Sequence, residues 1–125
     1  MNNDLEQTLK RDTDGLLAYE YMANHIESIA DFEDTVINHL LNVDLTGQLL
    51  VSAARYLHAI DAETHTDSIK RLIDSAINRD RERRYIPDLL PALWGTDYEE
   101  RAAELSATDN NFRRIYKRVK PSSTI

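Results

Sequence analysis

The sequence predicts an all-α protein, a single-domain bundle of about five or six helices with a Pro-interrupted apolar segment at residues 85–95. Three observations support this class. Apolar residues recur at three- and four-residue spacing along most of the chain, and no stretch alternates apolar and polar residues as a strand would. Only three glycines and three prolines occur in 125 residues. The length suits one domain with one core, so we expect a single domain over 1–125 with a flexible tail at 121–125.

The first half of the chain predicts three helices. Apolar spacing over residues 16–30 indicates the first, whose free N–H groups can be capped by Asp12 or Asp14. A second, shorter helix is expected over residues 32–41. Asp44 can cap the third. The expected buried stripe of this third helix consists of Leu45, Leu49, Leu50, Ala53, Leu57 and Ile60.

A fourth helix is expected around residues 69–77. No glycine or proline occurs between Gly47 and Pro87, so the third and fourth helices could be continuous. We place a break at residues 62–66, because threonine, histidine and aspartate there are weak helix formers and good N-cap residues. The sequence alone leaves this continuity open.

The remaining segments follow from their helix-breaking and capping residues. Pro87 and Pro91 prevent one regular helix over residues 85–95, whose leucines and tryptophan are expected to fill the core. Thr96 begins a Thr-x-x-Glu capping-box pattern that predicts a helix start. Asp109 can cap a last helix over residues 110–119. No internal repeat is evident.

The charge of the chain is unevenly distributed. The net charge is -7, yet residues 1–67 carry 13 Asp or Glu against 3 Lys or Arg, whereas residues 68–125 carry 9 against 12. An acidic surface favours association with a basic partner. We therefore predict a non-catalytic protein-binding module of the adaptor, inhibitor or immunity-protein kind. Its expected acidic partner-binding face comprises Glu20, Glu27, Asp31, Glu33, Asp34 and Asp44.

The last expected helix suggests an alternative, a nucleic-acid-binding helical protein. A helical projection places its apolar residues on one side and five cations on the other, with no acid among them. Cations on a helix surface can contact phosphates. Against this, the isoelectric point near 5.0 is low for such a protein, and cations also suit a helix C-terminus. The basic face comprises Arg113, Arg114, Lys117, Arg118 and Lys120.

A second alternative is a small metal-dependent enzyme built around His58, Asp61 and His65. His58 and Asp61 are three residues apart and would share a helix face. The spacing matches no established metal motif, and the same residue types are preferred in helix caps and turns. No Gly-rich phosphate loop or nucleophile elbow occurs. We therefore expect no catalytic residues, no metal and no cofactor.

Composition sets the remaining expectations. The absence of cysteine excludes disulfides and thiolate chemistry. The N-terminal residues carry Asp4 and Glu6 without an apolar core, and no run of eighteen apolar residues occurs, which predicts no signal peptide and no membrane span. A cytoplasmic location is the default. We expect a protein partner, with nucleic acid as the alternative and homo-oligomerisation left open.

Overall fold

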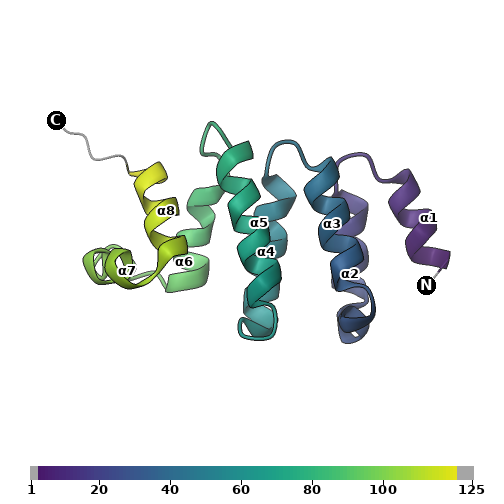
Figure 1. Ribbon diagram of the computed structural model, residues 1–125, viewed down its shortest axis with the longest axis horizontal. Helices are drawn as coiled ribbons and strands as arrows, with labels where there is room; N and C mark the ends of the chain where they lie inside the picture. Colours follow the sequence, from purple (N-terminus) through teal and green to yellow (C-terminus); the bar gives the residue numbers. More distant parts are fainter. Residues whose placement is uncertain (1–2, 121–125) are drawn as a thin grey trace. The chain divides into compact units, whose positions relative to one another are not determined.

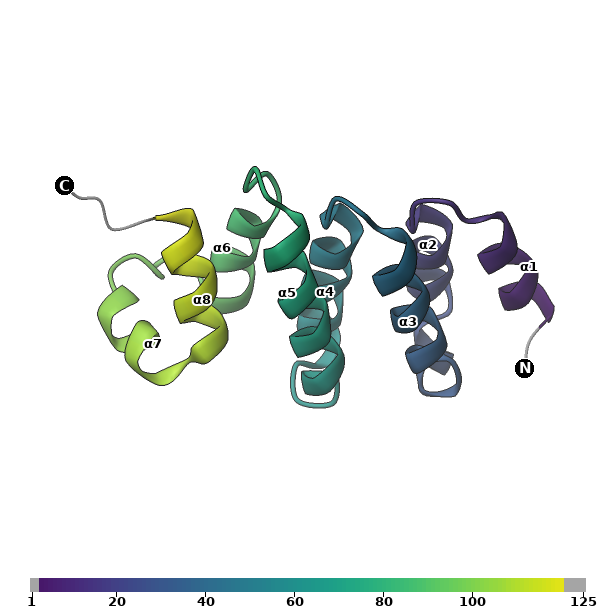
Figure 2. The same ribbon diagram turned by 45° about the horizontal axis from the view of Figure 1, so that its top comes forward.

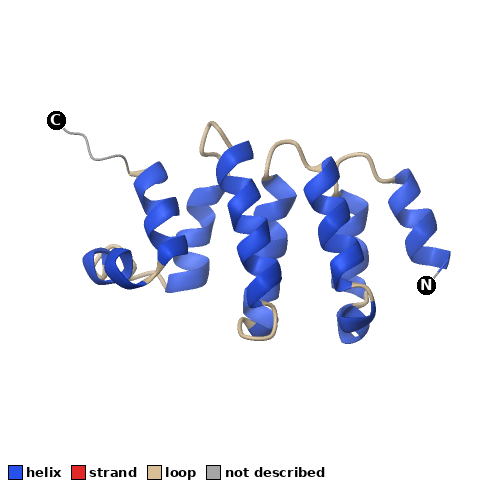
Figure 3. Cartoon of the chain, viewed as in Figure 1, coloured by secondary structure: helices blue, strands red, loops and turns tan. Residues whose placement is uncertain are grey.

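A computed structural model describes residues 3–120 of the chain and confirms the all-α class. Over these residues the chain forms eight α-helices and two short 3-10 helices, joined by turns and without a strand (Figure 3). This is more than the five or six helices expected, because short helices also form at residues 3–11 and within the segment 86–108. The expected tail, 121–125, lies outside the described residues.

The chain divides into two compact units, residues 1–45 and 46–125. That residues 1–125 form a single domain stays a prediction. The first unit contains α1 (Asn3–Arg11), α2 (Leu16–Asn24), η1 (Ile26–Asp31) and α3 (Glu33–Val43). Helices α2 and α3 lie side by side in both views (Figures 1 and 2). Their fully buried side chains are Ala18, Met22, Val36, Ile37 and Leu40.

The second unit contains α4 (Gln48–Asp61), α5 (Thr66–Arg79), η2 (Ile86–Asp88), α6 (Leu89–Trp94), α7 (Ala102–Thr108) and α8 (Asn110–Val119). The paired helices α4 and α5 contribute much of its core, and η2, α6 and α8 close it. The expected break between the third and fourth helices is confirmed, since residues 62–65 form a turn. In the Pro-interrupted segment, Leu89 and Leu90 are buried as expected and Ile86 is buried as well, but Leu93 and Trp94 are only half-buried.

A turn of one kind recurs three times. Each time a buried aspartate follows the end of a helix, at Asp12, Asp44 and Asp80, and the third residue after it adopts a positive φ. Those residues are Gly15, Gly47 and Arg83, with φ of 102°, 91° and 57°. The aspartates lie 32 and then 36 residues apart. The expectation that the chain has no internal repeat is therefore wrong.

Burial repeats in the same register. The seventh residue before each aspartate is fully buried, namely Leu5, Ile37 and Ile73. The third, sixth and seventh residues after each positive-φ residue are also buried, namely Ala18, Tyr21 and Met22, then Leu50, Ala53 and Ala54, then Ile86, Leu89 and Leu90. The first two turns each lead into two long helices, α2 and α3 and then α4 and α5, whereas the third leads into the shorter η2, α6, α7 and α8. The spacing of the turns is in the range of helical repeats.

Two of the buried aspartates, Asp80 and Asp12, hold their turns together by accepting backbone hydrogen bonds. The Asp80 carboxylate accepts from the N–H groups of Arg84 (2.9 Å), Tyr85 (2.7 Å) and Ile86 (2.8 Å). The Asp12 carboxylate likewise accepts three backbone N–H groups, from Gly15, Leu17 and Ala18. Each carboxylate thereby satisfies the free N–H groups that precede or begin the next helix.

The expected stripe of the third helix is right in its middle and wrong at its ends. Leu50, Ala53 and Leu57 are buried, but Leu45 is 78% exposed and Ile60 49% exposed. Leu45 precedes α4 and belongs to the turn, so its side chain does not follow the helical register. Ile60 lies in the last turn of α4, next to the loop that leads to α5. Helical periodicity therefore fails at the two ends of the element.

One expected helix end and one expected helix start differ in the structure. The helix expected over residues 16–30 ends at Asn24, because His25 leaves helical geometry (φ -123°, ψ 32°) and η1 follows. The capping-box pattern at Thr96 does not start a helix. Helix α7 begins only at Ala102, after a series of turns in which the N–H of one residue bonds to the carbonyl three residues earlier. Glu99 bonds instead to Lys120, at 2.7 Å. The Glu99 side chain, which the capping-box pattern assigns to the helix start, therefore binds Lys120, a residue distant in sequence.

We expect Gly47→Ala to lower the free energy of unfolding by about 2 kcal/mol, because a side chain at positive φ is strained. An added Cβ would also lie 3.3 Å from the Cβ of Asp80, inside the neighbouring turn. Urea denaturation of the variant measures this loss. Gln48→Ala, at the exposed first residue of α4, is the control and should stay within about 0.5 kcal/mol. Equal stability of both variants would contradict the strained-turn account.

Candidate functional site

The structure places most of the predicted acidic face near one end of the α2–α3 pair. Glu27 and Asp31 lie on η1 and are exposed, and Asp34 is exposed in the first turn of α3. Glu33 is half-buried in the same turn, where its negative charge interacts favourably with the positive end of the helix dipole. Glu20 is exposed on α2. Four of the six predicted residues are thus exposed.

Asp44 does not belong to this face. It is only 3% exposed and occupies the aspartate position of the repeated turn. The prediction that Asp44 contacts a partner is therefore wrong, because its side chain is enclosed by the fold. The sequence predicts Asp44 as the cap of the third helix, whereas Gly47 occupies the N-cap position of α4.

The acidic character of this part of the chain is unbroken in sequence. No lysine or arginine occurs between Arg11 and Arg55, whereas eight aspartates and glutamates do. Two of the eight, Asp12 and Asp44, are buried. The exposed carboxylates of α2, η1 and α3 are therefore not interrupted in sequence by a lysine or arginine, and they give the surface a negative potential.

The expected basic helix is confirmed as α8, with Asp109 at its N-cap accepting from the Phe112 N–H at 3.1 Å. Phe112 and Ile115 are buried as the projection predicts. Several of its cations contact other parts of the second unit. Lys120 pairs with Glu99, which raises the Lys120 pKa through the hydrogen bond and the opposite charge. The same Lys120 hydrogen bond lowers the pKa of Glu99.

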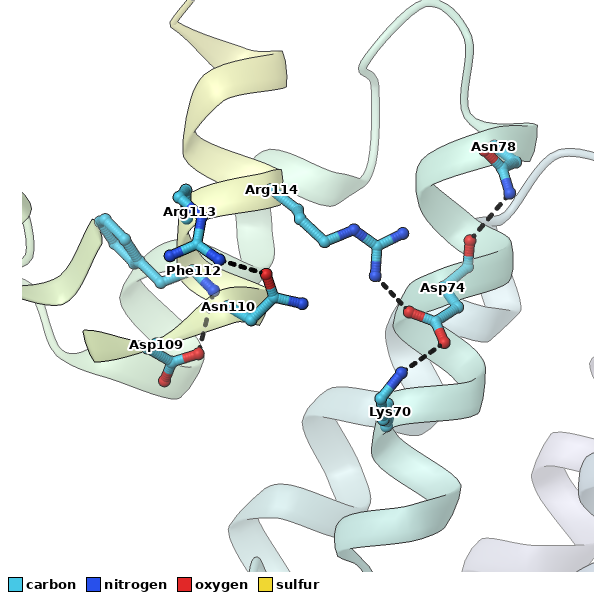
Figure 4. A network of polar contacts seen from close by, with 8 residues as sticks. All are labelled: Lys70, Asp74, Asn78, Asp109, Asn110, Phe112, Arg113 and Arg114. Carbon is cyan, nitrogen blue, oxygen red and sulfur yellow. Dashed lines mark hydrogen bonds and ion pairs between the residues drawn. The ribbon is translucent and has the colours of Figure 1, made fainter. Parts of the chain in front are cut away.

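Arg113 and Arg114 differ in their contacts (Figure 4). Arg113 donates to the Ser106 carbonyl at 2.9 Å and to the Asn110 side chain. Arg114 reaches across to Asp74 on α5, whose other carboxylate oxygen accepts from Lys70 at 3.0 Å. Partial burial acts to raise the Asp74 pKa, but the hydrogen bonds from Arg114 and Lys70 outweigh it, and the pKa is lowered. Asp74 is therefore ionised at neutral pH.

A groove lies beside α8. It has a volume of about 570 Å³ and is lined by Ile77 of α5, Arg83 of the third turn, and Arg114, Lys117 and Arg118 of α8. Four of these five lining residues are cationic and none is acidic. We call this the basic groove. Arg113 and Lys120, which the sequence groups with the other cations, do not line it.

The three weak metal candidates have separate roles. The Asp61 carboxylate accepts from the hydroxyl (2.7 Å) and the N–H (3.2 Å) of Thr64, and the hydroxyl bond is the largest influence lowering its pKa. His65 is 4% exposed at the N-cap position of α5. Within residues 3–120, no three His, Asp or Glu side chains gather where they could hold a metal ion. Residues 61–67 form the joint between α4 and α5.

His58 lines a pocket of about 150 Å³ to which α4, α5, α6, α8 and the turn between α4 and α5 all contribute residues. The polar lining includes Thr66, Asp109 and Asn111 besides His58 itself, and Ile69 and Leu93 are among the apolar lining residues. Asp109 is already engaged there, because it accepts from the Trp94 indole N–H at 2.8 Å as well as capping α8. The histidine thus meets a different set of residues from the one its sequence neighbours suggested.

From the sequence, Arg79, Arg81, Arg83 and Arg84 could all join the cations of the last helix in contacting phosphates, and composition does not distinguish Arg83 among them. The structure places only Arg83 of these four in the basic groove. The repeated turn does distinguish Arg83 from the neighbouring arginines. Arg83 follows Asp80 by three residues, as Gly15 follows Asp12 and Gly47 follows Asp44. A cation at a position where the other copies carry glycine marks this residue.

The chain matches no protein-family model, no curated protein and no solved structure. In the part of the chain that the structure describes, no helix combines the length and apolar character needed to span a membrane. What the fold shows is an all-α chain in which one kind of turn, with a buried aspartate and a positive-φ residue three positions later, occurs three times within residues 3–120.

Proposed function

We propose that this protein is a non-catalytic helical-repeat module that binds a basic protein partner through the acidic surface of α2, η1 and α3. The observation that carries the proposal is the stretch between Arg11 and Arg55, which has exposed carboxylates and no lysine or arginine. A surface of one sign speeds encounter with an oppositely charged partner and disfavours partners of like charge.

The repeat supports a binding role. In a helical repeat, the recurring buried positions determine the fold, and the exposed positions are free to vary. Here the buried aspartate and the buried apolar positions recur, while the exposed positions of α2 and α4 do not resemble each other. Glu20, for example, has Ser52 at the corresponding place in the second copy. Such exposed positions are where repeat proteins commonly contact partners.

The test is affinity capture by the full chain from the cells that express it. Nuclease treatment removes proteins that are bridged by nucleic acid, and mass spectrometry identifies those retained. We expect at least one retained protein to be basic, with capture that weakens as salt is raised, because salt screens exposed charges.

Charge reversal then locates the surface. The triple variant Glu20→Lys, Glu27→Lys and Asp31→Lys changes exposed residues of the first unit. We expect it to slow association with the captured partner by about tenfold, because the attraction is replaced by repulsion. Surface plasmon resonance gives the association rate.

A matched control carries the same change in net charge on the second unit. It combines Glu63→Lys, Glu100→Lys and Glu104→Lys, all of which are exposed. Normal association of this control, together with slow association of the first variant, supports the acidic face. Equal slowing in both variants would mean that only total charge matters, and the proposed face would be rejected.

A further inference from the structure

The basic groove brings cations together from segments that are far apart in sequence. Arg83 comes from the turn after α5, whereas Arg114, Lys117 and Arg118 come from α8. Ile77 supplies the apolar part of the lining. Like charges this close repel one another, so the arrangement costs free energy unless an anion or an acidic side chain compensates it.

Acidic side chains compensate it only in part. Asp74 pairs with Arg114, but Lys70 shares the same carboxylate, so that one negative charge faces two positive ones (Figure 4). Within residues 3–120, the side chains of Arg83, Lys117 and Arg118 have no hydrogen bond or ion pair. The groove thus retains several cations whose donors are available to a ligand.

The pairing with Asp74 positions Arg114. A guanidinium group has five N–H donors in a rigid planar fork, and the contact with Asp74 leaves others free. Because Asp74 is held from its other side by Lys70, the carboxylate restricts the orientation of Arg114 (Figure 4). A preoriented guanidinium loses less conformational entropy when it binds an oxyanion.

Arg83 occupies a position that favours glycine. Its φ is 57°, and the equivalent residues of the other two turns are Gly15 and Gly47. A left-handed conformation is strained for a residue with a side chain, and such strain is concentrated at binding and catalytic sites. The strained backbone places one further cation at the groove, which glycine would not provide.

From these features we infer that the basic groove is a binding site for phosphate groups, either of a polyphosphate-bearing small molecule or of a nucleic-acid strand. A planar guanidinium group can donate two parallel hydrogen bonds to the oxygens of one phosphate group, and a lysine ammonium adds a positive point charge. The groove, of about 570 Å³, is open to solvent and has room for more than one phosphate group. This site is separate from the acidic face.

Inorganic tripolyphosphate and a mixed-sequence single-stranded oligonucleotide are the two probes. Calorimetry with the full chain measures the first, and fluorescence anisotropy the second, at low and moderate salt. We expect at least one probe to bind, although the protein has a net charge of -7 and therefore repels polyanions elsewhere on its surface. If only tripolyphosphate binds, the ligand is a small polyphosphate; if only the oligonucleotide binds, it is a nucleic-acid strand.

Two variants and one control assign the binding to the groove. The double variant Lys117→Gln, Arg118→Gln should weaken binding by about tenfold. For the oligonucleotide, the slope of log affinity against log salt concentration should also become shallower, by the equivalent of about two phosphate contacts. Arg83→Gly should also weaken binding while leaving the protein at least as stable, because glycine relieves the strain. Arg113→Gln removes one cation from α8 outside the groove and should bind normally.

The variant Arg83→Gly keeps the test falsifiable, because poor folding cannot explain a loss of binding in a protein that remains stable. Binding of neither probe to the wild-type protein would overturn the inference. Unchanged binding by Arg83→Gly and by the double variant, or an equal loss in Arg113→Gln, would overturn it as well.

Discussion

Replacing Asp80 by alanine is expected to lower the free energy of unfolding of the second unit by about 3 kcal/mol. The Asp80 side chain is 3% exposed and accepts three backbone N–H groups, the last of them from the buried residue Ile86. Each buried donor left without an acceptor costs about 1–3 kcal/mol, offset in part because the buried carboxylate itself no longer needs to be desolvated.

Urea denaturation followed by tryptophan fluorescence measures this effect. Trp94 is the only tryptophan of the chain and lies in the second unit, so its emission reports unfolding there. Glu82→Ala provides the control from the same turn, since Glu82 is exposed and pairs only with Arg84. It should change stability by less than about 0.5 kcal/mol. A change of similar size in the two variants would show that Asp80 does not hold the turn.

Phe112→Ala is expected to be the most damaging single substitution, with a loss of about 3–5 kcal/mol. Phe112 is fully buried and forms the centre of an aromatic cluster. Its ring meets Trp94 edge-on, with centroids 5.2 Å apart, and stacks on Tyr116 at 5.1 Å. Removal of the ring leaves a cavity between α6 and α8 and removes both ring contacts.

The emission of Trp94 tests this prediction in two ways. The midpoint of denaturation should fall, and the native emission should shift to longer wavelength as water reaches the indole. Tyr116→Phe is the matched control, because it keeps the stacked ring and removes only a hydroxyl whose hydrogen bond to exposed Glu99 is 3.3 Å long. That control should stay within about 0.5 kcal/mol of the wild type. A smaller loss in Phe112→Ala than in the control would contradict the central role of the ring.

The two proposals about binding can fail independently. The acidic face is tested by reversing Glu20, Glu27 and Asp31, whereas the basic groove is tested at Arg83, Lys117 and Arg118. These residues lie in different compact units. A protein that binds polyphosphate but no basic partner would retain the inference about the groove and lose the proposed function. A protein that binds a basic partner but no polyphosphate would retain the proposed function and contradict the inference about the groove.

Local patterns predicted the helices that have strong periodicity and clear caps. The last helix was expected over 110–119 with Asp109 as its cap, and α8 has these bounds. The joint at residues 62–66 was expected from weak helix formers and is present as a turn. Both features depend on residues within a few positions of each other, so the local sequence contains the information.

The repeated turn was missed although its residues are local. Its copies are unevenly spaced, because α4 and α5 each have 14 residues whereas α2 has 9 and α3 has 11. In addition, Arg83 replaces glycine in the third copy. A search for one fixed period, or for one conserved glycine, therefore finds no repeat. Burial of the three aspartates makes it evident.

The sequence by itself determined the helical class, most of the helix positions and the acidic character of the first half, because these follow from short-range periodicity, capping and composition. Only the tertiary structure decided which charged residues act together. It enclosed Asp44, placed His58 in a pocket that Trp94 also lines, and brought Arg83 to α8. The physical reason is that side chains from separate helices meet only after the apolar faces have packed, and that packing depends on contacts distant in sequence.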